Sequence, residues 1–409
     1  MKILFLTSTL PRFAADLQAP FVLQQAAAWK VKRPDDEVHI LAPHDAAAAR
    51  HEWLGDVEIH RFQYFIPESL QALAYPAIMP NVKRNPLLAL QIPPFVWAEY
   101  HVAKRLVREQ GFDLIYAHWV MPQGLVAHWL LRATGVPYVI QNHSSDLSVF
   151  ARFGAPGKSV ARKIIQDAAA MFCVNRRQKD YALTLFDAPD QADISEKITV
   201  LPMGVSLDVA SLRNRTRKAH RYQLGTISRL SRKKGIDLFI AAAKRLSEPV
   251  AVGIAGDGED LDDLKAMTES DAIHFPGFLF GADKLRFFED TKFMVFPSVS
   301  AGDDVEGLPV ALLEALCSGK VVIASRDTNV EMLPEWDRIK DDIFFLADPL
   351  DLDSFADTLR RMLQLTPPEV AARSKRLRAV MSRYLWDNLI EEFLASPGLP
   401  GQPLAKISD

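Results

Sequence analysis

Short apolar runs alternate with longer segments of helical spacing along most of this chain, and this alternation limits its possible folds most. In the first half we expect strands at the apolar runs Ile3–Thr7, Glu37–Ala42, Leu114–Ala117, Tyr138–Gln141, Met171–Val174 and Ile198–Leu201. Segments with apolar residues at helical spacing lie between them, at Phe21–Val31, Pro94–Arg108, Gln123–Ala133 and Val160–Asp167. Strands that alternate with helices predict βαβ units and a parallel sheet.

The alternation stops once and then resumes. A polar, basic segment without apolar periodicity, Ser211–Arg221, interrupts it. Further strands are expected beyond it at Tyr222–Ser228, Ala251–Ala255, Ile273–Phe275, Phe293–Phe296, Val321–Ser325 and Ile343–Leu346. A chain of 409 residues is too long for one ordinary core. We therefore expect two doubly wound α/β domains, 1–205 and 222–379, joined by a linker at 206–221.

The end of the chain has its own pattern. The periodic segment Glu369–Leu394 predicts one or two helices with a break near Tyr384. Few apolar residues with any periodicity follow, so a disordered tail is expected at 397–409.

Composition excludes several classes of protein. The formal net charge of −3 argues against nucleic acid as the main partner. No uninterrupted apolar stretch reaches the ~18 residues that a spanning helix needs. The start, MKILFLTSTLP, has the character of a first strand and not of a signal peptide. Cys173 and Cys317 each have apolar neighbours, which is typical of buried free thiols in a reducing compartment. We therefore expect a cytoplasmic protein.

Two carboxylates with seven residues between them, Glu306 and Glu314, follow the apolar run Phe293–Phe296. Pro297 closes that predicted strand, and Pro309 with the apolar residues after it predicts the start of a helix. Glu306 is then expected in the loop at the carboxyl end of the strand, and Glu314 about two turns into the helix. Ligands bind at that end of the strands in open α/β sheets. Carboxylates and free helix N–H groups there suit a ligand with both hydroxyls and an anionic group.

A second predicted strand end carries cations. The segment GTISRLSRKKGID leads from a strand into a loop with four cations, among them Arg229 and Lys234, before a helix that begins near Gly235. Cations beside free helix N–H groups form a site for a multiply charged anion such as a diphosphate. A solvated basic loop is the alternative.

The next predicted strand, Ala251–Ala255, ends in the turn Gly256-Asp257-Gly258. Glycines at such a turn permit close approach of the backbone to a ligand. The pattern is not G-x-G-x-x-G, however, because Leu261 stands where the third glycine would be. A plain turn is the alternative.

Two histidines follow successive predicted strands of the first half. His118 ends one strand and His143 follows the next one along the chain, so both are expected at the same edge of the sheet. A hydrogen-bonded structural role is the alternative for each of them.

Taken in order, these motifs resemble those of the GT-B glycosyltransferases, and within them the large retaining class called family 4. The resemblance covers most of the chain, and its most specific parts are the segment from Arg229 to Gly235, the turn Gly256-Asp257-Gly258 and the Glu306–Glu314 pair. It implies a GT-B fold, in which two facing Rossmann-like domains enclose a cleft. The segment at Trp386 resembles the last helix of the family, expected at about 380–396 and crossing back to the first domain.

The resemblance also implies an activity. Family members transfer a sugar from a nucleotide diphosphate donor, here a UDP- or GDP-sugar, to an acceptor hydroxyl, with retention of configuration and without a metal or another cofactor. Arg229 and Lys234 would stabilise the charge that develops on the diphosphate. Glu306 would accept hydrogen bonds from sugar hydroxyls, and Glu314 would bind the ribose. His118 would lie near the donor sugar.

The remaining site positions also come from the resemblance. The donor-binding ones are Ser228, Gly256, Asp257, Gly258, Gly307, Leu308 and Pro309, and the acceptor-side ones are Arg12, Asp16, His143 and Asp146.

The chain departs from the family pattern in two loops. The first loop, from Thr9 to Pro20, contains no glycine, and Ala19 stands where a glycine is expected. The segment Ser325–Glu331 lacks the glycine that usually precedes a Pro-Glu pair. Asp260–Asp262 and Asp351–Asp353 have the D-x-D spacing of metal ligands, but both lie at expected helix starts, where Asp caps the helix. The sequence therefore predicts no metal-binding residues.

The segment 64–97 is rich in aromatic and aliphatic residues and also carries Lys83 and Arg84. Exposed apolar groups beside cations suit docking on an anionic bilayer, which predicts a peripheral protein at the cytoplasmic face of the membrane and a glycan or lipid-linked acceptor. Packing of the same residues over the first sheet is the alternative.

Three other functions stay open. A GT-B nucleotide-sugar 2-epimerase would need an acid/base pair at the sugar and no acceptor. A nicotinamide-dependent oxidoreductase is disfavoured, because no G-x-G-x-x-G follows Ile3–Thr7. A catalytically inactive GT-B subunit would agree with the missing glycines.

Overall fold

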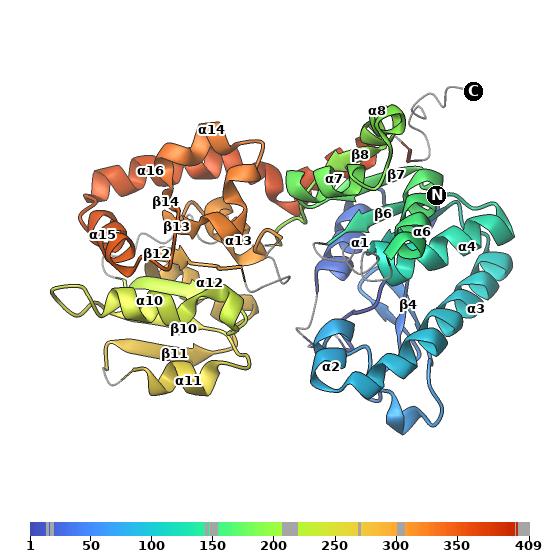
Figure 1. Cartoon of the computed structure of the whole chain (residues 1–409), viewed down its shortest axis with the longest axis horizontal. Helices are drawn as coiled ribbons and strands as arrows, with labels where there is room; N and C mark the ends of the chain where they lie inside the picture. The colour runs from blue at the N-terminus through green and yellow to red at the C-terminus, as the bar shows by residue number, and fades with distance from the viewer. Residues whose placement is uncertain are drawn as a thin grey trace. The chain divides into compact units, whose positions relative to one another are not determined.

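The computed structural model describes residues 1–13, 16, 20–143, 147, 154–206, 220–268, 271–300, 307–396 and 398–399. The chain divides into two compact units, which are Met1–Met203 together with the segment from Leu389 onward, and Gly204–Asn388. Figure 1 labels the elements of both units. Most of the predicted linker and of the predicted tail lies outside the described residues.

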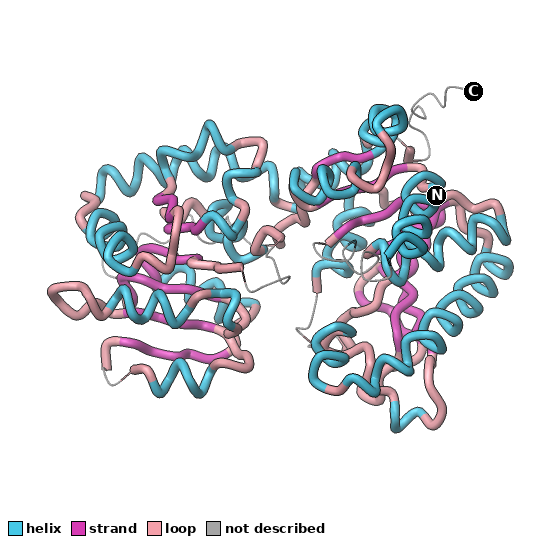
Figure 2. The backbone as a smooth tube through the Cα atoms, viewed as in Figure 1, coloured by secondary structure: helices cyan, strands magenta, loops and turns pink. Residues whose placement is uncertain are grey.

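A sheet of eight strands forms the centre of the first unit, in the order β3-β4-β2-β1-β5-β6-β7-β8. Neighbouring strands pair in parallel, except that β3 pairs antiparallel with β4. The strands are β1 (Lys2–Leu6), β2 (Glu37–Pro43), β3 (His51–Leu54), β4 (Val57–Phe62), β5 (Leu114–His118), β6 (Tyr138–Asn142), β7 (Ala170–Cys173) and β8 (Ile198–Val200). Helices flank the sheet (Figure 2), and they are α1 (Phe21–Lys32), α2 (Ile78–Arg84), α3 (Ile92–Gln110), α4 (Leu125–Thr134), α6 (Gly154–Asp167), α7 (Arg176–Leu183) and α8 (Ala188–Lys197).

The six strands predicted for this half are confirmed to within one or two residues at each end. Strands such as β5 and β6 are buried along their whole length, and a parallel strand covered on both faces is a continuous apolar run. The antiparallel pair β3 and β4 was not predicted. β4 alternates buried and partly exposed residues, so it lacks the apolar run by which the other strands were found.

A parallel sheet of six strands forms the centre of the second unit, in the order β11-β10-β9-β12-β13-β14. All six were predicted, and they are β9 (Tyr222–Ile227), β10 (Val252–Ala255), β11 (Ile273–Gly277), β12 (Thr291–Phe296), β13 (Val322–Ser325) and β14 (Phe344–Leu346). The helices are α10 (Ile236–Ala243), α11 (Leu261–Ala266), α12 (Gly281–Asp290), α13 (Val310–Cys317), α14 (Trp336–Ile339), α15 (Leu352–Leu363), α16 (Pro367–Met381) and α17 (Trp386–Ala395).

The predicted helix starts of the second half agree with the structure. α10 begins directly after Gly235, and α13 begins directly after Pro309. Glu314 is the fifth residue of α13, so it lies little more than one turn into the helix and not two. A short 3₁₀ turn that ends at Tyr384 separates α16 from α17, which confirms the predicted break.

The last helix connects the two units along the chain. α17 starts among residues of the second unit, and from Leu389 onward it belongs to the first. There the ring of Phe393 packs edge-on against Phe172 at 5.0 Å, and Glu391 pairs with Lys32 at 2.6 Å. The expected crossing of this helix to the first domain is thereby confirmed.

Two expectations from composition can be compared with the structure. Cys173 and Cys317 are both buried thiols that take part in no disulfide among the described residues, as predicted. None of the helices within the described ranges combines the length and the apolar character that crossing a bilayer requires.

Candidate functional site

A pocket of about 290 Å³ lies at the carboxyl ends of the central strands of the second unit. Its walls come from three neighbouring parts of this unit: the end of β9 with the loop after it, the end of β12, and the start of α13. The lining residues are Thr226, Ile227, Ser228, Arg229, Lys234, Ile236, Phe296, Pro297, Ser298, Leu308, Pro309, Val310 and Ala311. Five of the predicted site residues are thus brought together, namely Ser228, Arg229, Lys234, Leu308 and Pro309.

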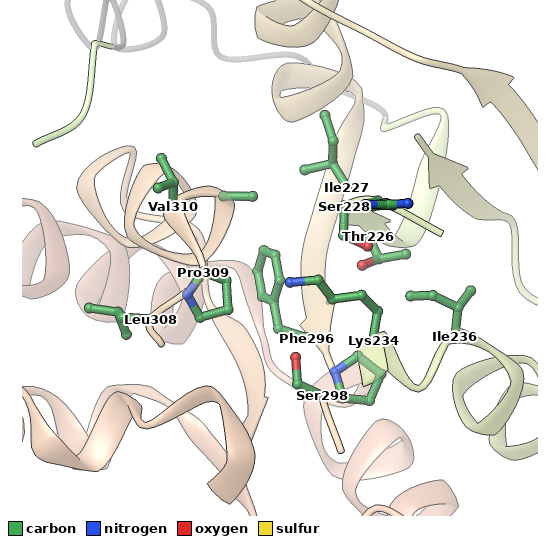
Figure 3. Close-up of a pocket in the computed structure, with 13 residues that line it drawn as sticks. Thr226, Ile227, Ser228, Lys234, Ile236, Phe296, Ser298, Leu308, Pro309 and Val310 are labelled. Carbon is green, nitrogen blue, oxygen red and sulfur yellow. The ribbon is translucent and has the colours of Figure 1, made fainter. Parts of the chain in front are cut away.

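Two cations from the basic loop line this pocket. Lys234 extends into it beside Phe296 (Figure 3). Arg229 is half exposed, and its Nε and one terminal nitrogen each lie 3.0 Å from the carboxylate of Glu259. A phosphate binds the same fork of N–H donors. An anion that binds Arg229 therefore either displaces Glu259 or shares the guanidinium donors with it. Sequence reasoning missed Glu259, which lies thirty residues further along the chain.

Two hydroxyl groups of the pocket wall have no hydrogen-bond partner among the residues that the structure describes. The Oγ1 of Thr226 and the Oγ of Ser228 are both buried, and no described residue bonds to either of them. A buried hydroxyl without a hydrogen bond costs on the order of 1–3 kcal/mol, and a bound polar ligand would recover that cost. The two groups therefore mark this wall as prepared for polar atoms of a ligand.

The shape of the basic loop depends on Gly235. Its φ is +61°, and a Cβ at this position would lie 2.2 Å from the carbonyl oxygen of Pro297. The amide of Val299 also donates to the carbonyl of Lys233 at 2.8 Å. Only a residue without a side chain lets the loop after β9 approach the segment after β12 so closely. This contact holds the cationic loop at the pocket.

Gly256 and Gly258 lie in close contact with the loop that carries Arg229. A Cβ on Gly256 would lie 1.8 Å from the carbonyl oxygen of Ser228, and one on Gly258 would lie 2.2 Å from that of Leu230. The amide of Leu230 donates to the carbonyl of Asp257 at 2.9 Å. These glycines let the turn after β10 pack on the loop that carries Arg229. They are not among the residues that line the pocket, and the donor-binding role expected of them stays a prediction.

The start of α13 is held by Asn329. Its Nδ2 donates to the carbonyl of Gly307 at 2.7 Å, and the bond is buried. Asn329 has φ +55°, a left-handed conformation that Asn adopts more readily than other residues with a side chain. It thus supplies, in the segment Ser325–Glu331, a left-handed position for which glycine is the usual choice. Glu306, the predicted partner of the sugar hydroxyls, lies outside the described residues.

Glu314 does not line the pocket. It is buried on α13, and its carboxylate pairs with Nζ of Lys284 on α12 at 2.5 Å. Burial raises the pKa of Glu314, and the nearby lysine partly opposes that rise. A ribose that binds Glu314 must compete with Lys284, which the sequence did not predict as its partner.

In the first unit, the two predicted histidines are brought together. Nδ1 of His118 and Nε2 of His143 lie 2.9 Å apart, with the rings stacked at 5.1 Å. His118 is fully buried at the end of β5, and its Nε2 bonds to no described residue. Burial lowers the pKa of His118 well below its usual value and that of His143 to about 3. Both rings are therefore neutral near pH 7, and they can donate or accept hydrogen bonds without carrying charge.

The side chain of Gln123 is buried and bonds to the main chain at His118. The side-chain amide of Gln123, oriented so that its nitrogen donates to the carbonyl of His118 at 2.9 Å, accepts from the amide of Ser8 at 3.1 Å. Glu99 on α3 is completely buried next to Gln123, and burial raises its pKa well above the usual value. Glu99 is therefore a neutral carboxylic acid, which can itself donate to the amide oxygen of Gln123.

Arg12 and Asp16, which were predicted to lie on the acceptor side, form an ion pair in the first loop. Nε of Arg12 lies 2.6 Å from the carboxylate of Asp16, which also accepts from the main-chain amide of Arg12 at 2.9 Å. The hydrogen bond to Asp16 raises the pKa of Arg12, so the guanidinium stays charged. Ala19 and Asp146 lie outside the described residues.

The segment 64–97 contains both buried and exposed apolar residues. Tyr64, Leu73, Ala74 and Phe95 belong to the core of the first unit, as the packing alternative predicts. Leu87 and Leu90, in contrast, are 73% and 74% exposed, and Trp97 and Ile66 are exposed as well. The segment therefore packs over the sheet and still presents apolar side chains to solvent.

The D-x-D segment at 351–353 has structural contacts. Asp351 accepts a hydrogen bond from the amide of Ser354 and caps α15, and Asp353 pairs with Arg245. The prediction of a helix cap is wrong for Asp260, which stands at the start of α11 but makes no capping hydrogen bond there.

Comparisons with known proteins agree for the two halves of the chain. Residues 28–209 match the sequence model of the family described as "Glycosyltransferase Family 4". Residues 221–365 match the model described as "Glycosyl transferases group 1". Between them the two matches include most of the chain.

Individual proteins are similar over shorter or longer stretches. The WcaL glycosyltransferase of Escherichia coli (strain K12), assigned to colanic acid biosynthesis, is 30% identical over 209 residues, which are 49% of this chain and 50% of that protein. The GDP-mannose-dependent alpha-(1-6)-phosphatidylinositol monomannoside mannosyltransferase of Mycolicibacterium smegmatis is 28% identical over 263 residues, 60% of this chain and 66% of that protein. The chain thus spans between half and two thirds of the length of these relatives.

A solved structure is similar over nearly the whole chain. Anabaena HepE, determined in complex with UDP-glucose, superposes with a TM-score of 0.64 at 18% identity and covers 96% of this chain and 99% of its own. At this level of identity the likeness establishes the fold, which is GT-B.

Proposed function

This chain belongs to glycosyltransferase family 4, the group 1 glycosyl transferases, and we propose that it transfers a sugar from a UDP- or GDP-sugar to an acceptor hydroxyl in polysaccharide or glycolipid synthesis. We propose further that transfer retains the anomeric configuration and needs no metal. The observation that carries the proposal is the pocket of the second unit, where Arg229, Lys234 and two hydroxyls to which no described residue bonds surround one space.

The pocket suits a nucleoside diphosphate. Arg229 supplies a planar fork of donors for phosphate oxygens, and Lys234 supplies a second positive charge beside it. The unpaired hydroxyls of Thr226 and Ser228 can each donate one further hydrogen bond. When the bond between sugar and diphosphate breaks, negative charge develops on the leaving oxygen, and fixed cations stabilise it. Two side-chain cations can take the place that a divalent metal has in other transferases.

The histidine pair of the first unit suits a sugar hydroxyl. Two neutral rings in contact can accept from one hydroxyl and donate to another, and no unpaired charge is buried in doing so. In this proposal Nε2 of His118, which no described residue bonds, faces the transferred sugar, and His143 lies on the acceptor side. A departing phosphate oxygen takes the proton of the acceptor, so the protein need not supply a nucleophile.

The donor can be tested directly. The full-length protein is incubated with a panel of UDP- and GDP-sugars, with and without added Mg²⁺, and its melting temperature is measured. We expect the melting temperature to rise with either the UDP-sugars and UDP or the GDP-sugars and GDP, because a bound ligand stabilises the folded protein by mass action. The rise should be the same with and without Mg²⁺. Stabilisation by NADH instead would support the oxidoreductase alternative and contradict the proposal.

Transfer itself needs a matched pair of variants. Arg229→Ala should lower kcat about 100-fold, because it removes one donor to the developing charge. Arg232→Ala is the control, since Arg232 lies in the same loop but is exposed and does not line the pocket. Equal losses in both variants would contradict the role of Arg229. If the sugar nucleotide is converted without release of the nucleoside diphosphate, whatever the acceptor, the 2-epimerase is favoured. If the sugar nucleotide is not converted at all, an inactive subunit is favoured.

The acceptor is proposed to be a glycan or lipid-linked glycan at the cytoplasmic face of the membrane. The exposed Leu87, Leu90 and Trp97 follow Lys83 and Arg84 within 64–97, and Lys104 and Arg108 lie on the next turns of α3. Apolar groups that insert among lipid headgroups together with cations give the two signals that stable peripheral binding needs. Flotation with anionic and neutral vesicles tests this. We expect binding to anionic vesicles that Leu90→Asp abolishes, and absence of binding in the wild type would refute it.

A further inference from the structure

Three histidines and one glutamate meet on one face of the sheet of the first unit. His39 lies on β2, His51 on β3, and Glu58 and His60 on β4. Strand pairing sets His39 opposite Glu58 and His51 opposite His60. Residues opposite each other, and residues two apart on one strand, project from the same face. The register of three strands therefore brings all four side chains together.

The ligand atoms of these side chains lie very close to one another. Nδ1 of His39 is 3.3 Å from Nε2 of His60 and 3.1 Å from the carboxylate of Glu58. The same carboxylate is 3.4 Å from Nε2 of His60 and 2.7 Å from Nε2 of His51. Within the part of the chain that the structure describes, no other group of metal-ligating residues converges in this way.

We propose that this cluster is a binding site for a divalent metal ion of the zinc class, with His39, Glu58 and His60 as ligands. His51 lies outside this group, but its Nε2 is 2.7 Å from the Glu58 carboxylate, and rotation of its exposed side chain would bring it to the fourth position. A tetrahedral zinc ion with bonds of about 2.0 Å places its ligand atoms roughly 3.3 Å apart. Nδ1 of His39 and Nε2 of His60 are 3.3 Å apart, and they lie 3.1 and 3.4 Å from the two different oxygens of the Glu58 carboxylate. A rotation of that carboxylate brings one oxygen between the two nitrogens, so an ion fits among the three residues without movement of the strands. Imidazole with one carboxylate suits zinc and its neighbours, whereas Mg²⁺ and Ca²⁺ prefer oxygen alone.

The surroundings suit such a site. The side chain of His39 is only 3% exposed, and its ring packs edge-on against Phe112 at 5.0 Å, which fixes its orientation. Its other nitrogen, Nε2, faces the carboxylate of Glu37 at 3.8 Å, the kind of outer partner that metal-binding histidines commonly have. His51, at 55% exposure, stands on the open side and leaves a path by which an ion can enter.

A hydrogen-bonded cluster without metal is the competing explanation. Nδ1 of His39 and Nε2 of His60 face each other, so either one of them carries a hydrogen or a cation lies between them. In the first case the four residues only join the hairpin of β3 and β4 to the rest of the sheet. In the second they do so through an ion. The cluster lies in the first unit and the diphosphate pocket in the second, so a structural ion here is compatible with metal-independent transfer.

Zinc binding to the full-length protein separates the two explanations. The protein, without a histidine tag, is stripped with EDTA and dialysed against Zn²⁺, and bound metal is measured together with the visible spectrum of the Co²⁺ form. The variants are His60→Ala and His51→Ala, and the control is His101→Ala, since His101 is exposed on α3.

We expect one ion per chain in the wild type and the control, with the visible bands of tetrahedral Co²⁺. His60→Ala should bind none, and loss of the fourth ligand in His51→Ala should raise the Kd about tenfold or more. If His60→Ala does not fold, the surface variant His51→Ala decides. Less than half an ion per wild-type chain, or wild-type affinity in His51→Ala, would overturn the proposal.

Discussion

Replacement of Asn329 tests whether one side chain sets the geometry at the start of α13. Asn329 does two things: it adopts φ +55°, and its Nδ2 donates a buried hydrogen bond of 2.7 Å to the carbonyl of Gly307. Asn329→Gly keeps the backbone conformation and removes the side chain together with its hydrogen bond to Gly307, which should cost about 1 kcal/mol of stability. Asn329→Ala also forces a left-handed conformation on alanine, which adds about 1–2 kcal/mol. Its expected total cost is therefore about 2–3 kcal/mol.

The two variants should also differ from the wild type in donor binding. Gly307 precedes Leu308 and Pro309, which line the pocket, so a freer Gly307 carbonyl lets that wall move. A loss of about 1 kcal/mol in binding corresponds to roughly fivefold in Kd. Denaturant unfolding measures the stability, and titration with UDP and GDP measures the affinity. A positioning role predicts that Asn329→Gly weakens binding even where the protein is fully folded.

Asn388→Ala is the matched control, because its Nδ2 also donates to a main-chain carbonyl at 2.7 Å, but at an exposed position of α17. It should cost little stability and leave nucleotide affinity unchanged. If Asn329→Gly were as stable as the wild type and bound nucleotide equally well, the hydrogen bond would contribute nothing, and the reasoning would fail.

Three further perturbations follow from buried groups. Gly235→Ala should lower the unfolding free energy by about 3 kcal/mol or more, because its Cβ would meet the carbonyl oxygen of Pro297 at 2.2 Å. Gly281→Ala is the control: its φ is +49° but the space around it is open, so it should cost only about 1–2 kcal/mol in the same assay. Lys284→Ala leaves Glu314 buried without its cation and should cost about 3 kcal/mol near pH 8. Burial raises the pKa of Glu314, so the stability that comes from its neutral form is present at low pH and is lost as the pH rises. The difference in unfolding free energy between wild type and Lys284→Ala should therefore shrink towards pH 5. A difference that stays constant with pH would contradict this. Burial raises the pKa of Glu99, so the wild type loses stability as the pH rises, and Glu99→Gln removes this loss. The variant should therefore gain stability relative to the wild type between pH 5 and pH 8. If the difference in unfolding free energy did not change over this range, Glu99 would not be neutral.

Most of the fold could be predicted from the sequence because its signals are local. A parallel strand covered on both faces is apolar at most of its positions, so β12 is visible in the sequence as the run Phe293–Phe296. Helix ends are marked by single residues with a conformational reason, as Pro309 and Gly235 are. The strand ends then place the residues that follow them at one edge of the sheet. This is why Arg229, Lys234 and Pro309 could be expected together.

The contacts that adjust the site were not predictable in the same way. Glu259 meets Arg229, Lys284 meets Glu314 and Asn329 meets Gly307 across twenty to thirty residues, and no spacing rule connects them. The segment around Asn329 was judged to depart from the family by the absence of glycine. What the backbone needs there is a residue that tolerates positive φ, and asparagine does so while adding a donor that glycine lacks. This departure therefore gives no reason to expect an inactive protein.

The missed hairpin and the proposed metal site have one cause. β3 and β4 were overlooked because polar residues interrupt their apolar pattern, and three of those residues, His51, Glu58 and His60, belong to the cluster. Sequence motifs for metals depend on ligands at fixed spacing along one element. Here the spacing arises only after β2, β3 and β4 pair in register, since His39 is nineteen residues before Glu58 along the chain but directly opposite it in the sheet. His51, Glu58 and His60 of this hairpin face a histidine of the next strand, while Glu52 and Arg61 form an ion pair on its other face. A shared ligand explains why the three residues meet there, because at this sheet edge water could have solvated each of them separately.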